Sequence, residues 1–229
     1  MSVRYDSDIL WPYSTIVLAT SDDRRIPSFN SSALVKKSGT AAWMASNCNT
    51  RSRREDLVKA MQNHIQVDVY GKCGTLTCDK AEHENCLKWL AEHYWFYLAF
   101  ENSVCQDYTT EKFWLLLTLD IVPVVLSRRA VPRRMPPAAF IAVDDFPDVK
   151  TFTQHLTYLM INHSAYMEYF RWRNDGWTRA YQQPGHYIGI CRLCQMLYDQ
   201  TLPSTMIPDI NDWFYTGFQC VDNFALRFI

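Results

Sequence analysis

Short apolar runs alternate with helix-like segments along most of this chain, and this order constrains the fold more than any other feature. In chain order, strands are predicted at residues 40–45, 66–70, 95–100, 121–126 and 140–143, and helices at 51–63, 110–120, 149–161 and 164–172. Strand–helix–strand units join parallel strands through right-handed crossovers. We therefore predict an α/β protein with a Rossmann-like, doubly wound parallel sheet. At 229 residues and 48% hydrophobic content, the chain is long enough to bury a full core.

A polar segment follows the strand predicted at 95–100. Glu101, Asn102 and Ser103 would lie at the carboxyl end of that strand, where ligands bind in open α/β sheets. The side chains of these residues are therefore candidates for a binding site.

The helix predicted at 110–120 begins with a second set of candidates. Thr109 or Thr110 can cap the helix, which places Glu111 and Lys112 in its first turn. Free backbone N–H groups and a lysine at such a turn attract a phosphate, whereas Glu111 and Tyr108 suit the hydroxyl groups of a ribose or a sugar. Spacing alone is explained equally well by an ordinary capped helix with a surface Glu–Lys pair.

Other nucleotide-binding designs lose support. The chain has neither a Gly-x-Gly-x-x-Gly motif nor a phosphate-binding loop, so we do not expect a dinucleotide oxidoreductase or a nucleoside triphosphatase. Asp144 and Asp145 are adjacent, and strand alternation would direct them to opposite faces. A metal site there is improbable.

Charge excludes nucleic acid as a partner. The net charge is −1, which supplies no overall attraction for a polyanion. Arginines cluster at 51–54 and at 128–134, and a solvated basic face explains most of them. The aromatic face predicted at 164–172 is expected to pack in the core rather than to stack on a base.

Eight cysteines favour a lumenal protein with disulfide bonds. A four-thiolate zinc site made by Cys73, Cys78, Cys191 and Cys194 is the competing interpretation. Asn30 and Asn162 begin Asn-x-Ser triplets and are candidate glycosylation sites.

A long series of short motifs supports a more specific interpretation. In order, they are Phe100-Glu101-Asn102-Ser103, Asp107-Tyr108, Thr110-Glu111-Lys112, Val122-Pro123-Val124-Val125, Pro136-Pro137, Phe140-Ile141 and Asp145-Phe146. This series resembles the signature of the α1,3/α1,4-fucosyltransferases of glycosyltransferase family 10, and the resemblance extends over most of the chain. Two positions depart from it: Ser127 replaces a common glycine, and Val131 stands where many members have a tyrosine.

The resemblance implies one lobe of a GT-B glycosyltransferase, the carboxy-terminal lobe that binds the donor. We expect residues 1–38 to be an inter-lobe segment or a remnant of the amino-terminal lobe. Residues 39–183 would be the GDP-fucose-binding Rossmann-like domain, and residues 184–229 a cysteine-containing extension. Family members act on the lumenal side of the Golgi membrane. No apolar run here is long enough for their anchor, so the chain is expected to be a fragment or a truncated product.

The resemblance also implies a set of donor-binding residues: Arg54, Tyr70, Glu101, Asn102, Ser103, Tyr108, Glu111 and Lys112. Arg54 corresponds to an arginine that contacts the donor phosphate, although the adjacent Arg53 leaves that register open by one residue. Binding would need no obligatory cofactor, and a divalent cation would be non-essential. The family's disulfides replace zinc in this interpretation, and Cys191-x-x-Cys194 resembles a pair whose partners partly lie in the other lobe.

The implied reaction is transfer of L-fucose from GDP-β-L-fucose, with inversion, to N-acetylglucosamine-containing glycans. Arg54 and Lys112 would stabilise the departing diphosphate. The catalytic base is expected in the amino-terminal lobe, so no catalytic residue is assigned here. Alternative functions are a catalytically inactive GDP-sugar-binding module and a zinc-stabilised interaction domain.

Overall fold

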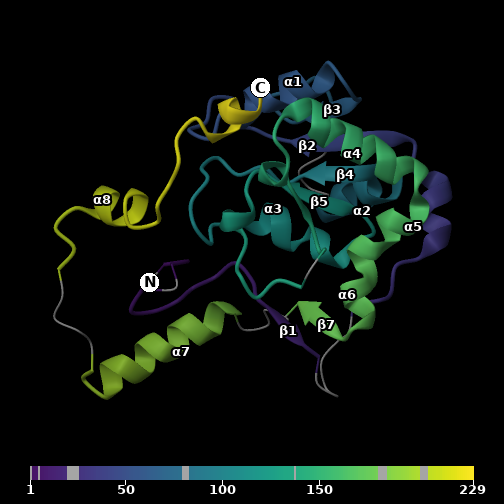
Figure 1. The fold of residues 1–229 in the computed structure, drawn as a ribbon. Coiled ribbons are helices and arrows are strands. Elements are labelled where there is room, and N and C mark those ends of the chain that lie inside the picture. The colour runs from purple at the N-terminus through teal and green to yellow at the C-terminus, as the bar shows by residue number, and fades with distance from the viewer. Residues whose placement is uncertain are drawn as a thin grey trace.

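The protein is described by a computed structural model that covers residues 2–4, 6–19, 26–78, 83–136, 138–179, 185–201 and 206–229. Its centre is a five-stranded parallel sheet with strand order β3-β2-β4-β5-β6 (Figure 1). The strands are β2 (Gly39–Met44), β3 (Val67–Tyr70), β4 (Tyr94–Leu98), β5 (Val122–Val125) and β6 (Ile141–Ala142). The predicted α/β parallel sheet is confirmed.

The order of the strands creates a switch point beside β2. From β2 the chain passes through α1 (Arg54–Gln62) to β3 on one side, and then through α2 (His83–His93) to β4 on the other side. Because the chain moves to one side of β2 to form β3 and then crosses to the other side to form β4, a crevice is expected outside the carboxyl ends of β2 and β4. This is the place where the fold itself favours a ligand.

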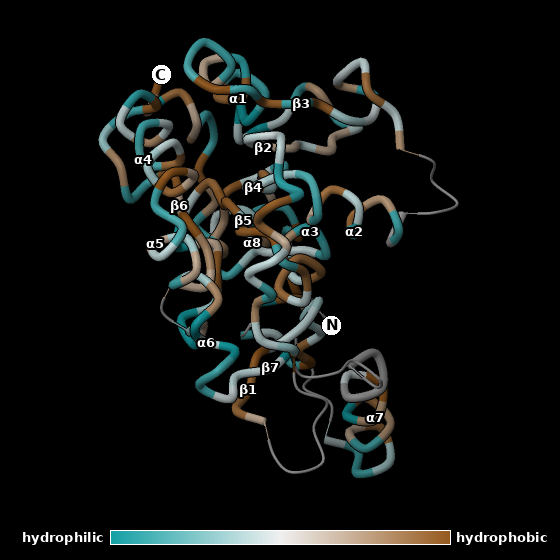
Figure 2. The backbone as a smooth tube through the Cα atoms, turned by 90° about the vertical axis from the view of Figure 1, so that its right-hand side faces the viewer, coloured by the Kyte–Doolittle hydropathy of each residue, from teal (hydrophilic) through white to brown (hydrophobic). Residues whose placement is uncertain are grey.

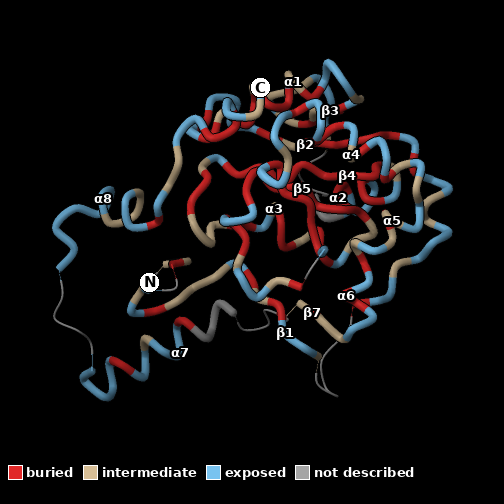
Figure 3. Tube along the Cα trace, in the orientation of Figure 1, coloured by how far each residue is buried: buried red, intermediate tan, exposed pale blue. Residues whose placement is uncertain are grey.

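Helices cover both faces of the sheet, and the strands are the most deeply buried part of the chain (Figure 3). On one face, Leu57 and Met61 of α1 pack with Phe152 of α4 (Val149–Ile161). On the other face, Leu90 of α2 packs with Phe113 of α3 (Glu111–Trp114). Both β4 and β5 are buried along their whole length: β5 consists of valine and proline and is hydrophobic in Figure 2, and β4 consists of aromatic residues and one leucine.

Two predicted helices have different bounds. The helix predicted at 51–63 begins at Arg54, because the Glu55 carboxylate accepts hydrogen bonds from the Thr50 amide and hydroxyl and holds residues 50–53 as a turn. The helix predicted at 110–120 ends as an α-helix at Trp114 and continues as the 3-10 turn Leu116–Thr118. α4 has the predicted bounds.

The aromatic segment predicted at 164–172 is divided among α5 (His163–Met167), a 3-10 turn (Glu168–Phe170) and α6 (Arg171–Asn174). Tyr166, Phe170 and Trp172 are buried, and the Tyr166 hydroxyl donates a hydrogen bond to the Trp95 carbonyl at 2.8 Å. The expected packing role is therefore confirmed.

The prediction that Asp144 and Asp145 point to opposite faces of a strand is wrong. Residues Val143–Asp145 form a 3-10 turn, so the alternation of a strand does not apply. Asp144 accepts hydrogen bonds from the Ser127 hydroxyl at 2.6 Å and from the Arg128 amide at 2.9 Å, and Asp145 pairs with the Arg128 side chain. Both carboxylates thus hold the segment that follows β5, and Ser127 has a structural role.

Several elements have no counterpart in the sequence predictions. They are α2, the antiparallel strands β1 (Ile16–Leu18) and β7 (Trp177–Arg179), α7 (Gly185–Tyr198), α8 (Ile210–Tyr215) and the 3-10 turns Ser31–Lys36, Arg128–Ala130 and Phe224–Phe228. Figure 1 shows α7 and α8 outside the layers that enclose the large sheet. Among the described residues, no helix is both long and apolar enough to span a membrane.

Six of the eight cysteines form disulfides: Cys48–Cys73, Cys78–Cys86 and Cys105–Cys220. The zinc hypothesis is wrong, because Cys73 and Cys78 have no free thiolate. Cys191 and Cys194 are free and exposed on α7.

The two candidate glycosylation sites differ in their surroundings. Asn30 is exposed, and its side-chain oxygen accepts hydrogen bonds from the Ser32 amide and hydroxyl. The Asn162 amide nitrogen instead donates to the Tyr158 hydroxyl at 2.7 Å, while its oxygen caps α5. Glycan attachment thus remains a prediction for both sites. The side-chain nitrogen, to which a glycan would be attached, donates a hydrogen bond at Asn162, whereas at Asn30 the hydrogen bonds involve the side-chain oxygen.

Candidate functional site

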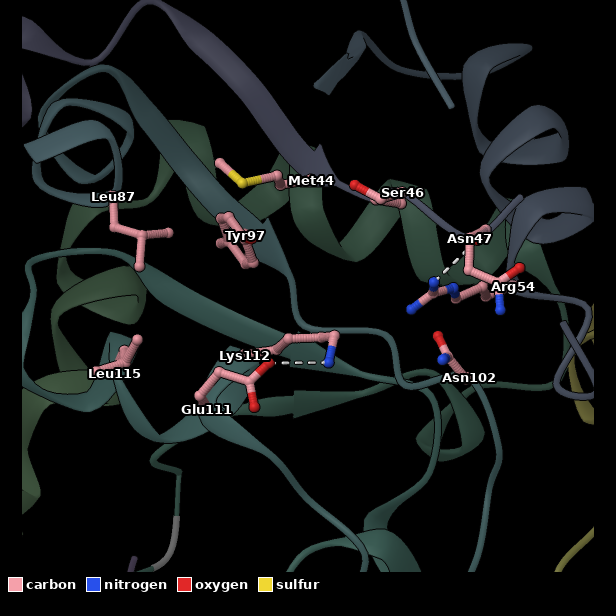
Figure 4. Close-up of a pocket in the computed structure, with 11 residues that line it drawn as sticks. Met44, Ser46, Asn47, Arg54, Leu87, Tyr97, Asn102, Glu111, Lys112 and Leu115 are labelled. Carbon is pink, nitrogen blue, oxygen red and sulfur yellow. Dashed lines mark hydrogen bonds and ion pairs between the residues drawn. The ribbon is translucent and has the colours of Figure 1, made fainter. Parts of the chain in front are cut away.

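A cavity of about 290 Å³ lies at the switch point, at the lower end of the size range of small-molecule sites. Its walls come from the segment after β2, from α1 and α2, from β4 and from the first turn of α3 (Figure 4). The lining residues are Met44, Ala45, Ser46, Asn47, Arg54, Leu87, Tyr97, Asn102, Glu111, Lys112 and Leu115. Figure 4 shows Arg54, Asn47 and Asn102 together at one end and Leu87 and Leu115 at the other.

Arg54 brings a buried positive charge to this cavity. Its side chain is among the largest fully buried ones, and its guanidinium donates hydrogen bonds to the Phe100 carbonyl and, at 3.1 Å, to the Asn47 carbonyl. Its Nε has no hydrogen-bond partner, and no described carboxylate lies within ion-pair distance of it, although the Glu101 and Glu55 carboxylates attract its charge from further away. Burial lowers the pKa of Arg54, since the charged form loses its hydration. A buried cation without a counterion favours an anionic ligand.

The structure distinguishes Arg54 from its neighbour. Arg53 begins α1 in the left-handed region, with φ of 58°, and its side chain turns to the surface to pair with Asp56 at 2.6 Å. The cavity therefore receives the arginine that the sequence analysis preferred.

Lys112 supplies a second positive charge. Its Nζ lies 3.2 Å from a Glu101 oxygen, 3.2 Å from a Glu111 oxygen and 2.9 Å from the Thr110 hydroxyl. The lysine side chain remains 28% exposed, so it is accessible from the cavity. Two carboxylates thus hold its ammonium group at the edge of the binding space.

Glu101 holds the start of α3 and does not line the cavity. The carboxylate is buried and accepts hydrogen bonds from the Thr110 amide at 2.8 Å and the Thr110 hydroxyl at 2.6 Å. Thr110 occupies the N-cap position as predicted, but its hydroxyl is directed to Glu101 and makes no capping bond to the helix. The Thr110 hydroxyl donates to the Glu101 carboxylate and accepts from the Lys112 ammonium at 2.9 Å, so the ammonium takes the acceptor role that a helix amide would use in a cap.

The remaining candidates lie in different surroundings. Asn102 lines the cavity, whereas Ser103 does not. Tyr108 is partly buried near Phe218, and loss of hydration raises the pKa of its phenol. Tyr70 is buried, with its hydroxyl 2.9 Å from the Tyr94 hydroxyl. The cavity therefore brings together four of the eight predicted residues, namely Arg54, Asn102, Glu111 and Lys112.

Several lining residues were not predicted as part of the site. Ser46 and Asn47 follow β2, and their position at the carboxyl end of a strand was a usable signal. Leu87 comes from α2, which the sequence analysis did not identify. Within the described ranges, no group of three or more His, Cys, Asp or Glu side chains is arranged to hold a metal ion.

Comparison with known families identifies the fold. The family model described as "Glycosyltransferase family 10 (fucosyltransferase) C-term" matches residues 34–213. The chain belongs to this family. The family resemblance of the sequence motifs is thus confirmed, and glycosyltransferase family 10 places the cavity within a fucosyltransferase fold.

Named relatives in family 10 agree. Alpha-(1,3)-fucosyltransferase fut-1 of Caenorhabditis elegans is 38% identical over 216 residues, covering 91% of this chain and 50% of the relative. The 3-galactosyl-N-acetylglucosaminide 4-alpha-L-fucosyltransferase FUT3 of Bos taurus is 38% identical over 217 residues, covering 93% and 56%. The chain thus spans about half the length of these curated relatives.

Solved α1,3-fucosyltransferase structures have a similar fold. An α1,3-fucosyltransferase crystal structure with GDP matches with a TM-score of 0.52 and 27% identity, over 60% of this chain and 39% of that one. A second crystal structure, with GDP-fucose, matches with a TM-score of 0.58 and 24% identity, and the match covers 77% of this chain and 51% of that one. At this identity the match supports the fold alone.

Proposed function

We propose that this chain forms the donor-binding part of an α1,3-fucosyltransferase that transfers L-fucose from GDP-β-L-fucose. The observation that carries the proposal is Arg54: a buried guanidinium without a counterion faces a cavity at the switch point, and Lys112 lies on the same cavity. A diphosphate supplies the missing negative charge. The names of the relatives and the GDP in a related structure support the same donor.

The lining of the cavity offers partners for the separate parts of a nucleotide sugar. Arg54 and Lys112 would contact the diphosphate, with Asn102 and Glu111 directed to hydroxyl groups of ribose or fucose. The apolar end at Leu87 and Leu115 suits the flat face of a guanine. Glu101 is proposed to position Lys112 and Thr110. We assign no direct donor contact on the cavity wall to three of the predicted residues, Tyr108, Ser103 and Tyr70.

The proposed reaction is direct displacement at the anomeric carbon, which inverts the β-linked donor to an α-linked fucoside. The bond from fucose to the diphosphate breaks as the acceptor hydroxyl attacks, and negative charge develops on the departing GDP. Arg54 is oriented in advance by two backbone carbonyls, so it stabilises this charge without rearrangement. The carboxylate that removes the acceptor proton is not assigned to this chain.

The acceptor is proposed to be an N-acetylglucosamine-containing glycan, and the cellular site the lumenal side of the Golgi membrane. Three disulfides support a lumenal environment. Donor binding would use arginine and lysine in place of an obligatory metal ion.

Calorimetric titration of the oxidised chain with GDP and GDP-fucose tests the donor site. We expect saturable binding that weakens by about tenfold or more in Arg54→Ala and in Lys112→Ala, since each removes a charge-assisted contact. Lys150→Ala is an exposed control, and Arg53→Ala, at a half-buried position paired with Asp56, is the neighbouring control, because neither residue lines the cavity. Equal losses in Arg53→Ala and Arg54→Ala, or no binding by the folded wild type, would contradict the proposal.

A further inference from the structure

A second cavity, of about 610 Å³, lies beyond the carboxyl end of β5. The segment 101–112 separates it from the proposed donor cavity: Asn102 and Lys112 line the first, whereas Gln106 and Asp107 line the second. Its volume is well within the range of small-molecule sites. None of the residues assigned to donor binding lines this second cavity.

The walls of the second cavity are tied to one another. The disulfide Cys105–Cys220 joins the segment 101–112 to the carboxy-terminal segment, and the Gln106 amide donates to the Phe218 carbonyl at 2.9 Å. The Asp107 amide donates to the Arg129 carbonyl at 3.0 Å, which joins the same segment to the turn after β5. The cavity is therefore pre-formed, and a ligand would bind without ordering a loop first.

Positive charge on its wall is only partly compensated. Arg128 pairs with Asp145, but the Arg129 guanidinium donates to the Gln219 carbonyl and side-chain oxygen, each at 3.1 Å, and both acceptors are neutral. Arg133 has neither a hydrogen bond nor an ion pair within the part of the chain that the structure describes. Asp107 is the carboxylate on this wall and interacts electrostatically with Arg133, while Arg128 is paired with Asp145, so Arg129 is the lining arginine that no described carboxylate compensates.

Solvated arginines are the ordinary alternative, and all three side chains are exposed. Two features argue against it. The arginines surround one cavity instead of being dispersed over a convex face, and Arg129 is held in place by uncharged groups that orient it without neutralising it. An oriented guanidinium is suited to bind a carboxylate or a sulfate in a two-bond geometry.

The rest of the lining indicates more than a bare ion. Val131, Met135 and Phe140 supply apolar surface, while the Gln106 and Gln219 side chains supply amide donors and acceptors. A sugar ring has both a hydrophobic face and hydroxyl groups for such a wall. A nucleic acid fits poorly, because the protein has a net charge of −1 and no extended basic surface follows from three arginines.

We propose that this cavity binds an acidic saccharide, whose sulfate ester or carboxylate lies between Arg129 and Arg133. If the chain acts in fucosyl transfer, the acidic saccharide would be part of an acceptor glycan, and in this respect the inference rests on the proposed function. Binding itself does not depend on it.

The test is titration of the oxidised chain with three probes: N-acetyllactosamine carrying a 6-sulfate, unsulfated N-acetyllactosamine and sodium sulfate. We expect the sulfated disaccharide to bind at least tenfold more tightly than either of the others, and to weaken as sodium chloride is raised. Arg129→Gln and Arg133→Gln should each weaken it by about tenfold, the value of one charge-assisted hydrogen bond. Arg134→Gln is the control, since that arginine is exposed, adjacent and not on the cavity.

A GDP titration of the same samples separates this inference from the proposed function. If GDP binds and the sulfated disaccharide does not, the second site is refuted and the donor site stands. If the disaccharide binds and GDP does not, the donor site is refuted and the second site stands. Equal affinity for the sulfated and unsulfated sugars, or an equal loss in Arg134→Gln, would overturn the assignment to Arg129 and Arg133. Sodium sulfate binding as tightly as the sulfated sugar would refute recognition of a saccharide.

Discussion

Replacement of Glu101 by glutamine distinguishes a residue that holds the site together from one that contacts the donor. The Glu101 side chain is 6% exposed and accepts hydrogen bonds from the Thr110 amide and hydroxyl, with Lys112 at 3.2 Å. Glutamine keeps the shape and one acceptor oxygen but removes the negative charge. Each hydrogen bond to an ionised group is worth roughly 1 kcal/mol more than a neutral one, so Glu101→Gln should lower the free energy of unfolding by about 2 kcal/mol.

Urea denaturation followed by tryptophan fluorescence measures this difference, and GDP titration of the same protein measures donor affinity. Glu111→Gln is the matched control for stability, because the Glu111 side chain is 50% exposed and its ion pair among the described residues is with Lys112. That control should change stability by less than about 0.5 kcal/mol, as exposed ion pairs contribute little. An unchanged denaturation midpoint in Glu101→Gln together with a large loss of GDP affinity would refute the positioning role and restore Glu101 as a donor ligand.

Three further predictions follow from other parts of the structure. Cys105→Ser combined with Cys220→Ser opens a loop whose ends are 115 residues apart. In urea denaturation the double variant should have a free energy of unfolding about 3–5 kcal/mol lower than the wild type, and it should not bind the sulfated disaccharide at the second cavity. Unchanged stability and binding would show that the cavity walls do not need the disulfide. Burial lowers the pKa of Lys37 to about 7, against the three hydrogen bonds that its ammonium donates to the Ala91, Tyr94 and Asp120 carbonyls, so between pH 7 and 10 the unfolded chain holds more protons than the folded chain. The free energy of unfolding should therefore rise with pH by up to about 1 kcal/mol per unit relative to Lys37→Met, and parallel curves would contradict this. Tyr166→Phe removes a buried hydroxyl that donates to the Trp95 carbonyl and should cost about 1 kcal/mol by thermal denaturation, whereas Tyr158→Phe, at an exposed position, serves as the comparison.

The two cavities give segment 101–112 a central place in the molecule. One end of it supplies Lys112 to the proposed donor site, and its middle supplies Gln106 and Asp107 to the arginine-lined cavity. Ser127 is one of the two departures from the family pattern. It follows β5, and its hydroxyl donates a hydrogen bond to the Asp144 carboxylate at 2.6 Å. The departure is therefore compatible with an ordered turn after β5.

The positions of the strands were largely determined by local sequence. A strand buried on both faces must be apolar along its whole length, so residues 94–98 and 122–125 are recognisable without any knowledge of their neighbours. Polar residues directly after such strands mark the ligand edge of the sheet, which is why Asn102 was predicted, and the predicted helix start supplied Glu111 and Lys112; all three lie on the cavity. The family motifs added Arg54.

Tertiary structure alone decided which polar groups are free for a ligand. Glu101 and Tyr70 could both hydrogen-bond a ligand. In the folded chain, however, the Glu101 carboxylate already accepts a hydrogen bond from Thr110, and the Tyr70 hydroxyl is already hydrogen-bonded to Tyr94. The same holds for Asp144 and Asp145, whose 3-10 turn depends on contacts with Ser127 and Arg128. Sequence patterns predict which residues are buried, because folding removes apolar side chains from water. Hydrogen-bond partners are chosen by distances of a few ångströms between remote segments, and those distances exist only after the chain has folded.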